Sequence, residues 1–197
     1  MLESKIRAKY QKYFIEPILA AVPGAVRPLH ITVLSLVSGL LIIPMIVVNE
    51  LAAVGLMFLS GYLDSLDGSL ARFRNDTSDV GAVLDIMSDR AVECAVFIAL
   101  FFKYPDIESG MIILMLIATL LCITSFLVVG IFEKNTSGKQ FHYSPGLIER
   151  AEAFIFFALM ILFPGIFVWL AIVYTVLVLY TAIVRVNEFC KARGVYF

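Results

Sequence analysis

Four aspartates inside two apolar segments carry the strongest chemical signal in this sequence. Asp64 and Asp67 are three positions apart and Asp85 and Asp89 are four apart, so each pair lies on one face of a helix. Carboxylates gathered in apolar surroundings repel one another unless protons, arginines or metal ions neutralise them. Oxygen-only ligand sets select hard cations, and four carboxylates can hold two ions ~3.5–4 Å apart, as phosphoryl chemistry requires. The pattern predicts a site for Mg²⁺ or Mn²⁺, with Ca²⁺ as a competitor and enough ligands for two ions.

Small residues accompany the aspartates and would let a ligand or another backbone approach closely. Gly68 and Ala71 lie in the first apolar segment, and Gly81 precedes the acids of the second. Arg72, one helical turn after Gly68, has the charge and the planar group to pair with a pyrophosphate. Two structural interpretations stay open beside this one: ordinary small-residue helix packing, and interhelical ion pairing of the aspartates, for example with Arg72 and Arg90.

The composition shows what kind of scaffold must hold these residues. The chain has 197 residues, of which 61% are hydrophobic and 16% charged. Soluble domains have ~45–50% apolar and ~25% charged residues, and a soluble globule of this length could not cover so much apolar surface. The aspartates are therefore predicted to lie in an integral membrane protein, where each buried charge is costly and points to function.

Six segments are long and apolar enough to be membrane-spanning helices, for which ~20 residues are needed. They cover residues 31–48, 51–72, 81–102, 111–132, 146–163 and 165–186. Before them, apolar residues recur at helical spacing among lysines over residues 1–22, which is typical of a helix lying in the membrane interface. The sequence thus predicts an all-α integral membrane protein: six transmembrane helices after an N-terminal interfacial amphipathic helix, in one domain over residues 1–197.

The distribution of Lys and Arg predicts the orientation. If both termini and the connections 73–80 and 133–145 face one side, that side and its adjoining helix ends hold every Lys and Arg except Lys103. The positive-inside rule makes this side cytoplasmic. We therefore expect cytoplasmic N- and C-termini and an active site facing the cytoplasm, in a multi-pass protein of the cell membrane. The net charge of −1 gives no indication of a nucleic-acid partner, and none is expected.

Together the chemical residues read Asp64-x2-Asp67-Gly68-x2-Ala71-Arg72-x8-Gly81-x3-Asp85-x3-Asp89. This run resembles the signature of the CDP-alcohol phosphotransferase family, and six spans after an interfacial helix are similar to that family's architecture. The resemblance implies a homodimeric membrane enzyme that transfers a phosphatidyl-type group from a CDP-linked lipid to a hydrophilic alcohol and releases CMP.

The resemblance also implies a role for each residue of the run. Asp89 would be the general base that takes the proton from the attacking hydroxyl. Two divalent ions would be held by Asp64, Asp67, Asp85 and Asp89. The nucleotide would lie against Gly68, Ala71, Arg72 and Gly81. These roles agree with general chemistry, since cations stabilise a departing phosphate and a hydroxyl needs a base to attack.

Basic residues beyond this run indicate where the acceptor binds. They lie on the predicted cytoplasmic side and are suited to an acceptor phosphate: Lys134, Lys139, Arg150 and Arg185. Residues 146–152 resemble the corresponding stretch of phosphatidylinositol phosphate and archaetidylinositol phosphate synthases, which implies a phosphorylated polyol such as inositol phosphate. Ala153 stands where that branch usually has Arg. Glycerol phosphate or another alcohol is therefore the alternative acceptor, and positive-inside anchoring is the alternative role for the two lysines.

Two other functional classes would also place charged residues in a membrane protein. A small ion- or proton-coupled transporter would also bury acids, but it would scatter them through the bilayer midplane, often in repeated halves. A non-catalytic scaffold would have no need of four converging carboxylates. The clustering of the acids beside Arg72 favours the transferase.

Overall fold

The computed structural model describes residues 10–106, 108–137, 148 and 150–195, with the backbone alone for residues 108 and 133–137. All regular secondary structure in these residues is helical, which confirms the all-α prediction. Three helical stretches among them are long and apolar enough to cross a membrane: Pro28–Val48, Ser109–Phe132 and Pro164–Ala192. The chain divides into two compact units, residues 5–105 and residues 106–197, which are described in turn.

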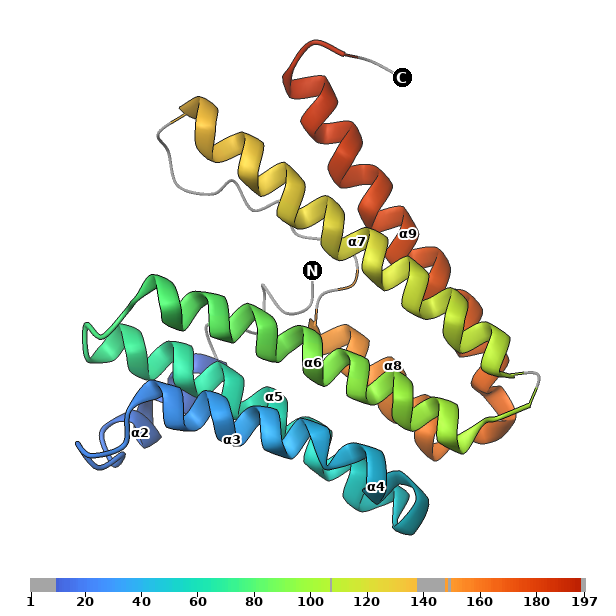
Figure 1. The fold of residues 1–197 in the computed structure, drawn as a ribbon, viewed down its shortest axis with the longest axis horizontal. Coiled ribbons are helices and arrows are strands. Elements are labelled where there is room, and N and C mark those ends of the chain that lie inside the picture. The colour runs from blue at the N-terminus through green and yellow to red at the C-terminus, as the bar shows by residue number, and fades with distance from the viewer. Residues whose placement is uncertain (1–9, 107, 138–147, 149, 196–197) are drawn as a thin grey trace. The chain divides into compact units, whose positions relative to one another are not determined.

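The first unit carries all four aspartates. Its elements are η1 (Gln11–Ile15), α2 (Glu16–Leu19), α3 (Pro28–Leu40), α4 (Ile42–Val48), α5 (Glu50–Phe73) and α6 (Asp79–Lys103). Helix α3 packs along both α5 and α6, and α4 extends these contacts beyond the end of α3 (Figure 1). The helices occur where the first three apolar segments of the sequence predict them, and α3 links the two aspartate-bearing helices.

A proline and two capping side chains set the helix boundaries of this unit. Pro44 has no N–H to donate to the carbonyl four residues earlier, and the helix is interrupted at Leu41, between α3 and α4. The Asn49 side chain and the Ser78 hydroxyl each accept a hydrogen bond of 3.0 Å from a backbone N–H three residues on. These caps start α5 and α6, so only residues 74–78 separate the two helices.

The segment that precedes α3 packs on α5. Ile15 and Leu19 are buried in one apolar cluster with Leu63, Leu66 and Leu70 of α5. Other apolar and aromatic side chains of the same segment stay exposed. The apolar residues that predicted an interfacial helix are therefore divided between α5 and the outside, and the described part of that helix begins at residue 10.

Close packing and a polar contact hold α3 against its neighbours. A Cβ atom built on Gly39 of α3 would lie 2.4 Å from Cγ2 of Val92, a fully buried residue of α6, so only glycine lets the helices approach this closely. On the other side, the Ser35 hydroxyl donates a hydrogen bond of 2.8 Å to the Ser60 carbonyl of α5. Small residues at helix crossings are typical of membrane proteins.

The second unit consists of α7 (Glu108–Ser137), α8 (Arg150–Leu162), the 3₁₀ turn η2 (Pro164–Ile166) and α9 (Phe167–Ala192). Helix α9 packs against both α7 and α8. Tyr174 of α9 stabilises both contacts: its hydroxyl is 2.9 Å from Thr119 Oγ1 of α7, and its ring centroid is 5.3 Å from that of Phe157 on α8. The short connection between α8 and α9 lies where the predicted spans 146–163 and 165–186 meet.

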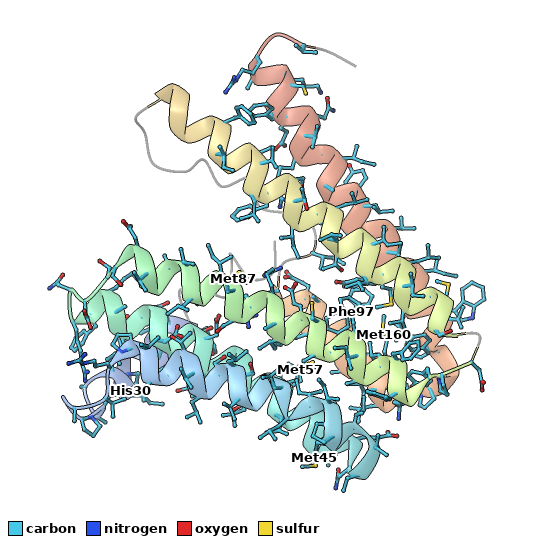
Figure 2. All side chains as sticks on the ribbon, in the orientation of Figure 1. His30, Met45, Met57, Met87, Phe97 and Met160 are labelled. Carbon is cyan, nitrogen blue, oxygen red and sulfur yellow. The ribbon has the colours of Figure 1, made fainter. Side chains whose placement is uncertain are left out.

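Large apolar side chains cover the outside of the helices as well as their contacts. Met57 of α5 is fully buried, whereas Met87 of α6 is 61% exposed (Figure 2). Exposed leucine, isoleucine, valine and phenylalanine side chains occur on every long helix. A soluble protein rarely exposes so much apolar surface, whereas a lipid environment accommodates it. The protein is a membrane protein, as its composition predicts.

Candidate active site

Three of the four aspartates come together between α5 and α6. Oxygen atoms of Asp64, Asp67 and Asp85 all lie within 4.8 Å of one another. Asp64 and Asp67 share one face of α5, and Asp85 lies near the start of α6, so the helical spacing brings them together as predicted. Asp67 is 3% exposed and the other two are half-buried. The cluster is therefore sheltered on one side and accessible on the other.

The donor set fits a hard divalent cation. Oδ2 of Asp67 is buried without a hydrogen-bond partner in the described part of the chain, which is costly for a carboxylate unless a cation approaches it. Carboxylate oxygens are the ligands that Mg²⁺ and Mn²⁺ prefer. Thr32 of α3, whose hydroxyl donates to the Pro28 carbonyl at 3.2 Å, is a further polar neighbour of Asp67. The residues present thus suit a metal ion, and the structure has an acidic triad that could bind one.

The fourth aspartate, Asp89, lies one helical turn beyond Asp85 and is not part of the converging triad. Its Oδ2 is 3.7 Å from Nη2 of Arg90, and Arg90 in turn donates a hydrogen bond of 2.6 Å to Glu93. The predicted convergence of four carboxylates is therefore observed for three. Arg90 thus pairs with Asp89 and Glu93 of its own helix α6, and not with an aspartate of α5, in the contacts observed among the described residues.

The residues predicted for the nucleotide lie beside this triad. Nη1 of Arg72 is 3.5 Å from the position of a Cβ atom built on Gly68, so the exposed guanidinium group lies over the glycine that follows Asp67. Ala71 is half-buried on the same helix. Gly81 lies in the first turn of α6, where its N–H donates to Ser78. The positively charged Arg72 side chain, small side chains and the start of α6 thus border the carboxylates. This arrangement suits a phosphorylated ligand.

The predicted acceptor residues belong to the second unit. The Arg150 guanidinium lies 5.3 Å from the Phe154 ring centroid. Nη1 of Arg185 donates hydrogen bonds to the Cys122 carbonyl at 2.9 Å and to the Ser125 hydroxyl at 3.0 Å. Arg185 therefore contributes to the packing of α9 on α7. Lys134 belongs to α7, but its side chain lies outside the described residues. Lys139 lies wholly outside them.

Gln11 and Ser69 are not among the predicted site residues, although Ser69 contacts Arg72 and Gln11 contacts Ser69. Ser69 occupies an unspecified position of the motif, between Gly68 and Arg72, and its hydroxyl accepts hydrogen bonds from Gln11 and Arg72. Gln11 lies 58 positions earlier, on η1. The neighbouring Tyr10 is partly buried, and this burial raises the pKa of its phenol, which therefore stays neutral. The sequence shows a polar residue, Ser69, one helical turn before Arg72, but nothing in it points to Gln11.

A protein-family comparison decides the class. The model of CDP-alcohol phosphatidyltransferases matches residues 25–183, which include every residue of the aspartate run. The chain belongs to the CDP-alcohol phosphatidyltransferase family. It is therefore a member of a transferase family of phospholipid synthesis, as the signature indicated.

Curated relatives extend this result. The chain is 30% identical over 172 residues to the inner membrane protein YnjF of Escherichia coli K12, covering 83% of this chain and 82% of that protein. It is 32% identical over 109 residues to phosphatidylinositol phosphate synthase of Mycobacteroides abscessus, covering 55% and 49%. It is also 37% identical over 93 residues to CDP-diacylglycerol–serine O-phosphatidyltransferase of Methanocaldococcus jannaschii, covering 47% and 42%. The names of these relatives give two different acceptors.

A solved structure shares the fold. The crystal structure of Mycobacterium tuberculosis phosphatidylinositol phosphate synthase with CDP-DAG bound matches with a TM-score of 0.62 and 22% sequence identity. The match covers 88% of this chain and 92% of that one. The helical fold of this chain is therefore that of a solved member of the family.

Proposed function

We propose that this protein is a metal-dependent phospholipid-synthesising enzyme that transfers a phosphatidyl-type group from a CDP-linked lipid to a phosphorylated polyol such as inositol phosphate, with release of CMP. The observation that carries the proposal is the convergence of Asp64, Asp67 and Asp85 within 4.8 Å, with a buried Asp67 oxygen that has no hydrogen-bond partner in the described residues. Family membership supplies the reaction class.

In this proposal the four aspartates hold two Mg²⁺ or Mn²⁺ ions: Asp64, Asp67, Asp85 and Asp89. The ions would neutralise charge on the pyrophosphate and on the departing CMP. Asp89 takes the proton from the acceptor hydroxyl. The oxygen of that hydroxyl forms a bond to the lipid-side phosphorus, and the bond from this phosphorus to the bridging oxygen breaks, so CMP leaves with that oxygen.

The donor would bind along the end of α5 and the start of α6. Arg72 pairs with the pyrophosphate, and the small residues Gly68, Ala71 and Gly81 let the nucleotide approach the helix backbones. The position of the Arg72 guanidinium over Gly68 supports this assignment. The lipid tails of the donor reach the site from the bilayer, and the nucleotide and acceptor reach it from the cytoplasm.

The acceptor phosphate would be bound by Lys134, Lys139, Arg150 and Arg185. The relatives named phosphatidylinositol phosphate synthase favour inositol phosphate as the acceptor. The relative named as a serine transferase is the reason to test other alcohols as acceptors too. Arg185 also holds α9 against α7 through its bonds to Cys122 and Ser125, so its substitution would disturb the packing as well. Arg150 is therefore the better residue to substitute in a test of acceptor binding. Glycerol phosphate is the alternative among phosphorylated acceptors.

The membrane arrangement proposed with this function is a single domain of six spans with both termini in the cytoplasm, forming a homodimer. Helices α5 and α6 have 24 and 25 residues, which is ~36 Å at ~1.5 Å per residue and exceeds the ~30 Å hydrocarbon core. Their length supports counting them among the spans.

The decisive experiment measures CMP release by the purified protein in detergent. CDP-diacylglycerol is supplied with Mg²⁺ or Mn²⁺ and one acceptor at a time: inositol phosphate, glycerol phosphate, inositol, serine or ethanolamine. We expect metal-dependent release with inositol phosphate, abolished in Asp89→Asn while CDP binding is retained. Near-full activity of Asp89→Asn would remove this residue as the base.

Two further arms distinguish the alternatives. Arg150→Ala is expected to raise the KM for the phosphorylated acceptor with little change in the KM for the donor, because in this proposal Arg150 binds the acceptor phosphate and not the donor. An unchanged acceptor KM would take Arg150 out of that site. If no acceptor supports release, the assay is repeated with CDP-archaeol. Failure there, together with failure to bind CDP, would favour the ion- or proton-coupled transporter.

A further inference from the structure

The hydroxyl of Ser69 has its full hydrogen-bonding capacity occupied at the edge of the candidate active site. It donates to the Ser65 carbonyl at 2.8 Å and accepts from Nε2 of Gln11 at 3.0 Å and from Nη2 of Arg72 at 3.2 Å. A serine hydroxyl has one hydrogen to donate and two lone pairs to accept with, so these three bonds complete it. Ser69 is 3% exposed, and water therefore has little access to replace any of its partners.

Gln11 is held in place by its own segment. Ile15 of η1 is fully buried in the cluster on α5, and the Tyr62 hydroxyl of α5 donates to the Phe14 carbonyl at 3.1 Å. Further along, the Arg74 guanidinium donates to three carbonyls of the connection between α2 and α3, at residues 22, 23 and 26. The segment is thus fastened to α5 on both sides of the candidate site, and the amide of Gln11 points to a defined place.

Arg72 benefits from this arrangement because it is long and exposed. A free arginine side chain has considerable rotamer entropy. Losing this entropy when a ligand binds weakens the binding. The bond from Nη2 to the Ser69 hydroxyl restricts the guanidinium to the region over Gly68, with Nη1 3.5 Å from the Cβ position of that glycine. The side chain is therefore organised before a ligand arrives.

We propose that Gln11 and Ser69 are positioning residues that hold Arg72 for the pyrophosphate of the donor, so that the interfacial segment is a working part of the donor site as well as a contact with the membrane. Gln11 and Ser65 orient the Ser69 hydroxyl, and the hydroxyl orients Arg72. This inference rests on the proposed function only in assigning Arg72 to the pyrophosphate.

The substitution Gln11→Met tests the first step, because methionine keeps the length and removes the amide. The affinity for CDP in the presence of Mg²⁺, and the KM for CDP-diacylglycerol, should weaken about two- to tenfold, the size expected for one net hydrogen bond. The KM for the acceptor should stay unchanged. Lys12→Met is the matched control, since Lys12 is an exposed long side chain on the same segment and its charge lies over the Tyr13 ring. It should leave CDP affinity at the wild-type value.

A double-substitution cycle tests whether Gln11 acts through Ser69. Ser69→Ala should weaken CDP binding at least as much as Gln11→Met, and the double variant should be no weaker than Ser69→Ala alone, because both changes remove one relay. Ser69→Thr keeps the hydroxyl and should recover most of the affinity. Thermal unfolding in detergent is recorded for every variant, and a loss of CDP affinity at an unchanged Tm separates positioning from general destabilisation.

Each result has a definite meaning. Additive effects of the two substitutions, or wild-type CDP affinity in Gln11→Met, would overturn the inference while leaving the proposed function intact. A wild-type protein that binds CDP through Gln11 and Ser69 but releases no CMP with any acceptor would support the inference and overturn the proposed reaction. A wild-type protein that does not bind CDP at all would overturn both.

Discussion

The contact between Gly39 and Val92 gives a stability prediction whose size follows from the coordinates. A Cβ atom on Gly39 would lie 2.4 Å from Cγ2, 2.8 Å from Cγ1 and 3.0 Å from Cβ of Val92. Val92 is fully buried, and a β-branched residue in a helix has one strongly preferred rotamer, so it cannot turn aside. Gly39→Ala must therefore push α3 away from α6.

The expected cost comes from two opposing effects. Overpacking a close contact costs ~1–3 kcal/mol, and three contacts at or below 3.0 Å place this site in the upper half of that range. Replacing glycine by alanine within a helix gains ~1 kcal/mol. The net loss should be about 1–2 kcal/mol. Gly55→Ala is the matched control, because Gly55 lies inside α5 with nothing within 4 Å of a Cβ atom, and it should be neutral or stabilising.

Thermal unfolding in one detergent provides the assay. At ~2–4 °C per kcal/mol for a chain of this size, Gly39→Ala should lower Tm by about 2–8 °C, and Gly55→Ala should not lower it. Val92→Ala removes the two γ carbons, so adding Gly39→Ala to Val92→Ala should cost less than adding it to the wild type. Equal Tm values for Gly39→Ala and Gly55→Ala would refute the close approach of α3 and α6. Because Val92 lies three residues after Asp89, a lower kcat of Gly39→Ala should accompany the lower Tm.

Two further predictions concern the metal site and the connection before α3. Asp67→Asn should lower the apparent Mg²⁺ affinity in the CMP-release assay at least tenfold, since it removes a charged ligand from the buried side of the triad. Asp76→Asn, an exposed acid after α5, should leave that affinity unchanged, and an equal effect of both would refute the assignment. Arg74→Ala should cost about 1–3 kcal/mol, because it removes the guanidinium donor from the Val22 and Val26 carbonyls and leaves the Pro23 carbonyl only its bond from the Val26 N–H; hydrogen exchange should rise over residues 22–26. Unchanged exchange there would show that the guanidinium does not hold this connection.

Much of the first unit could be predicted because its determinants are local. Apolar length places α3, α5 and α6, the capping side chains Asn49 and Ser78 mark two helix starts, and Pro44 marks a break. The spacing of the aspartates predicts which of them share a helix face, and the triad follows from that spacing together with the short connection between α5 and α6.

What could not be predicted depends on how helices rotate against one another. The bond from Gln11 to Ser69 joins residues 58 positions apart, and the bonds of Arg185 join α9 to α7 over 60 or more. Periodicity indicates which face of a helix is apolar, but the rotation that pairs two polar side chains is set by packing along the whole interface. The same limit applies to Asp89, whose distance from the triad depends on how α6 lies against α5.

The aspartates that reveal the chemistry also weaken the evidence for the spans that carry them. Helices α5 and α6 have 24 and 25 residues, yet they are not among the three stretches that qualify as spans on length and apolar character, because acids and arginine interrupt their apolar sequence. An ionised residue within a membrane helix costs several kcal/mol unless a partner compensates it. The cation proposed for this triad would offset the mutual repulsion of the three carboxylates and the burial of Asp67 at once. The aspartates interrupt the apolar sequence of α5 and α6. A metal ion bound by them would therefore stabilise the two helices at the positions where their apolar character is weakest.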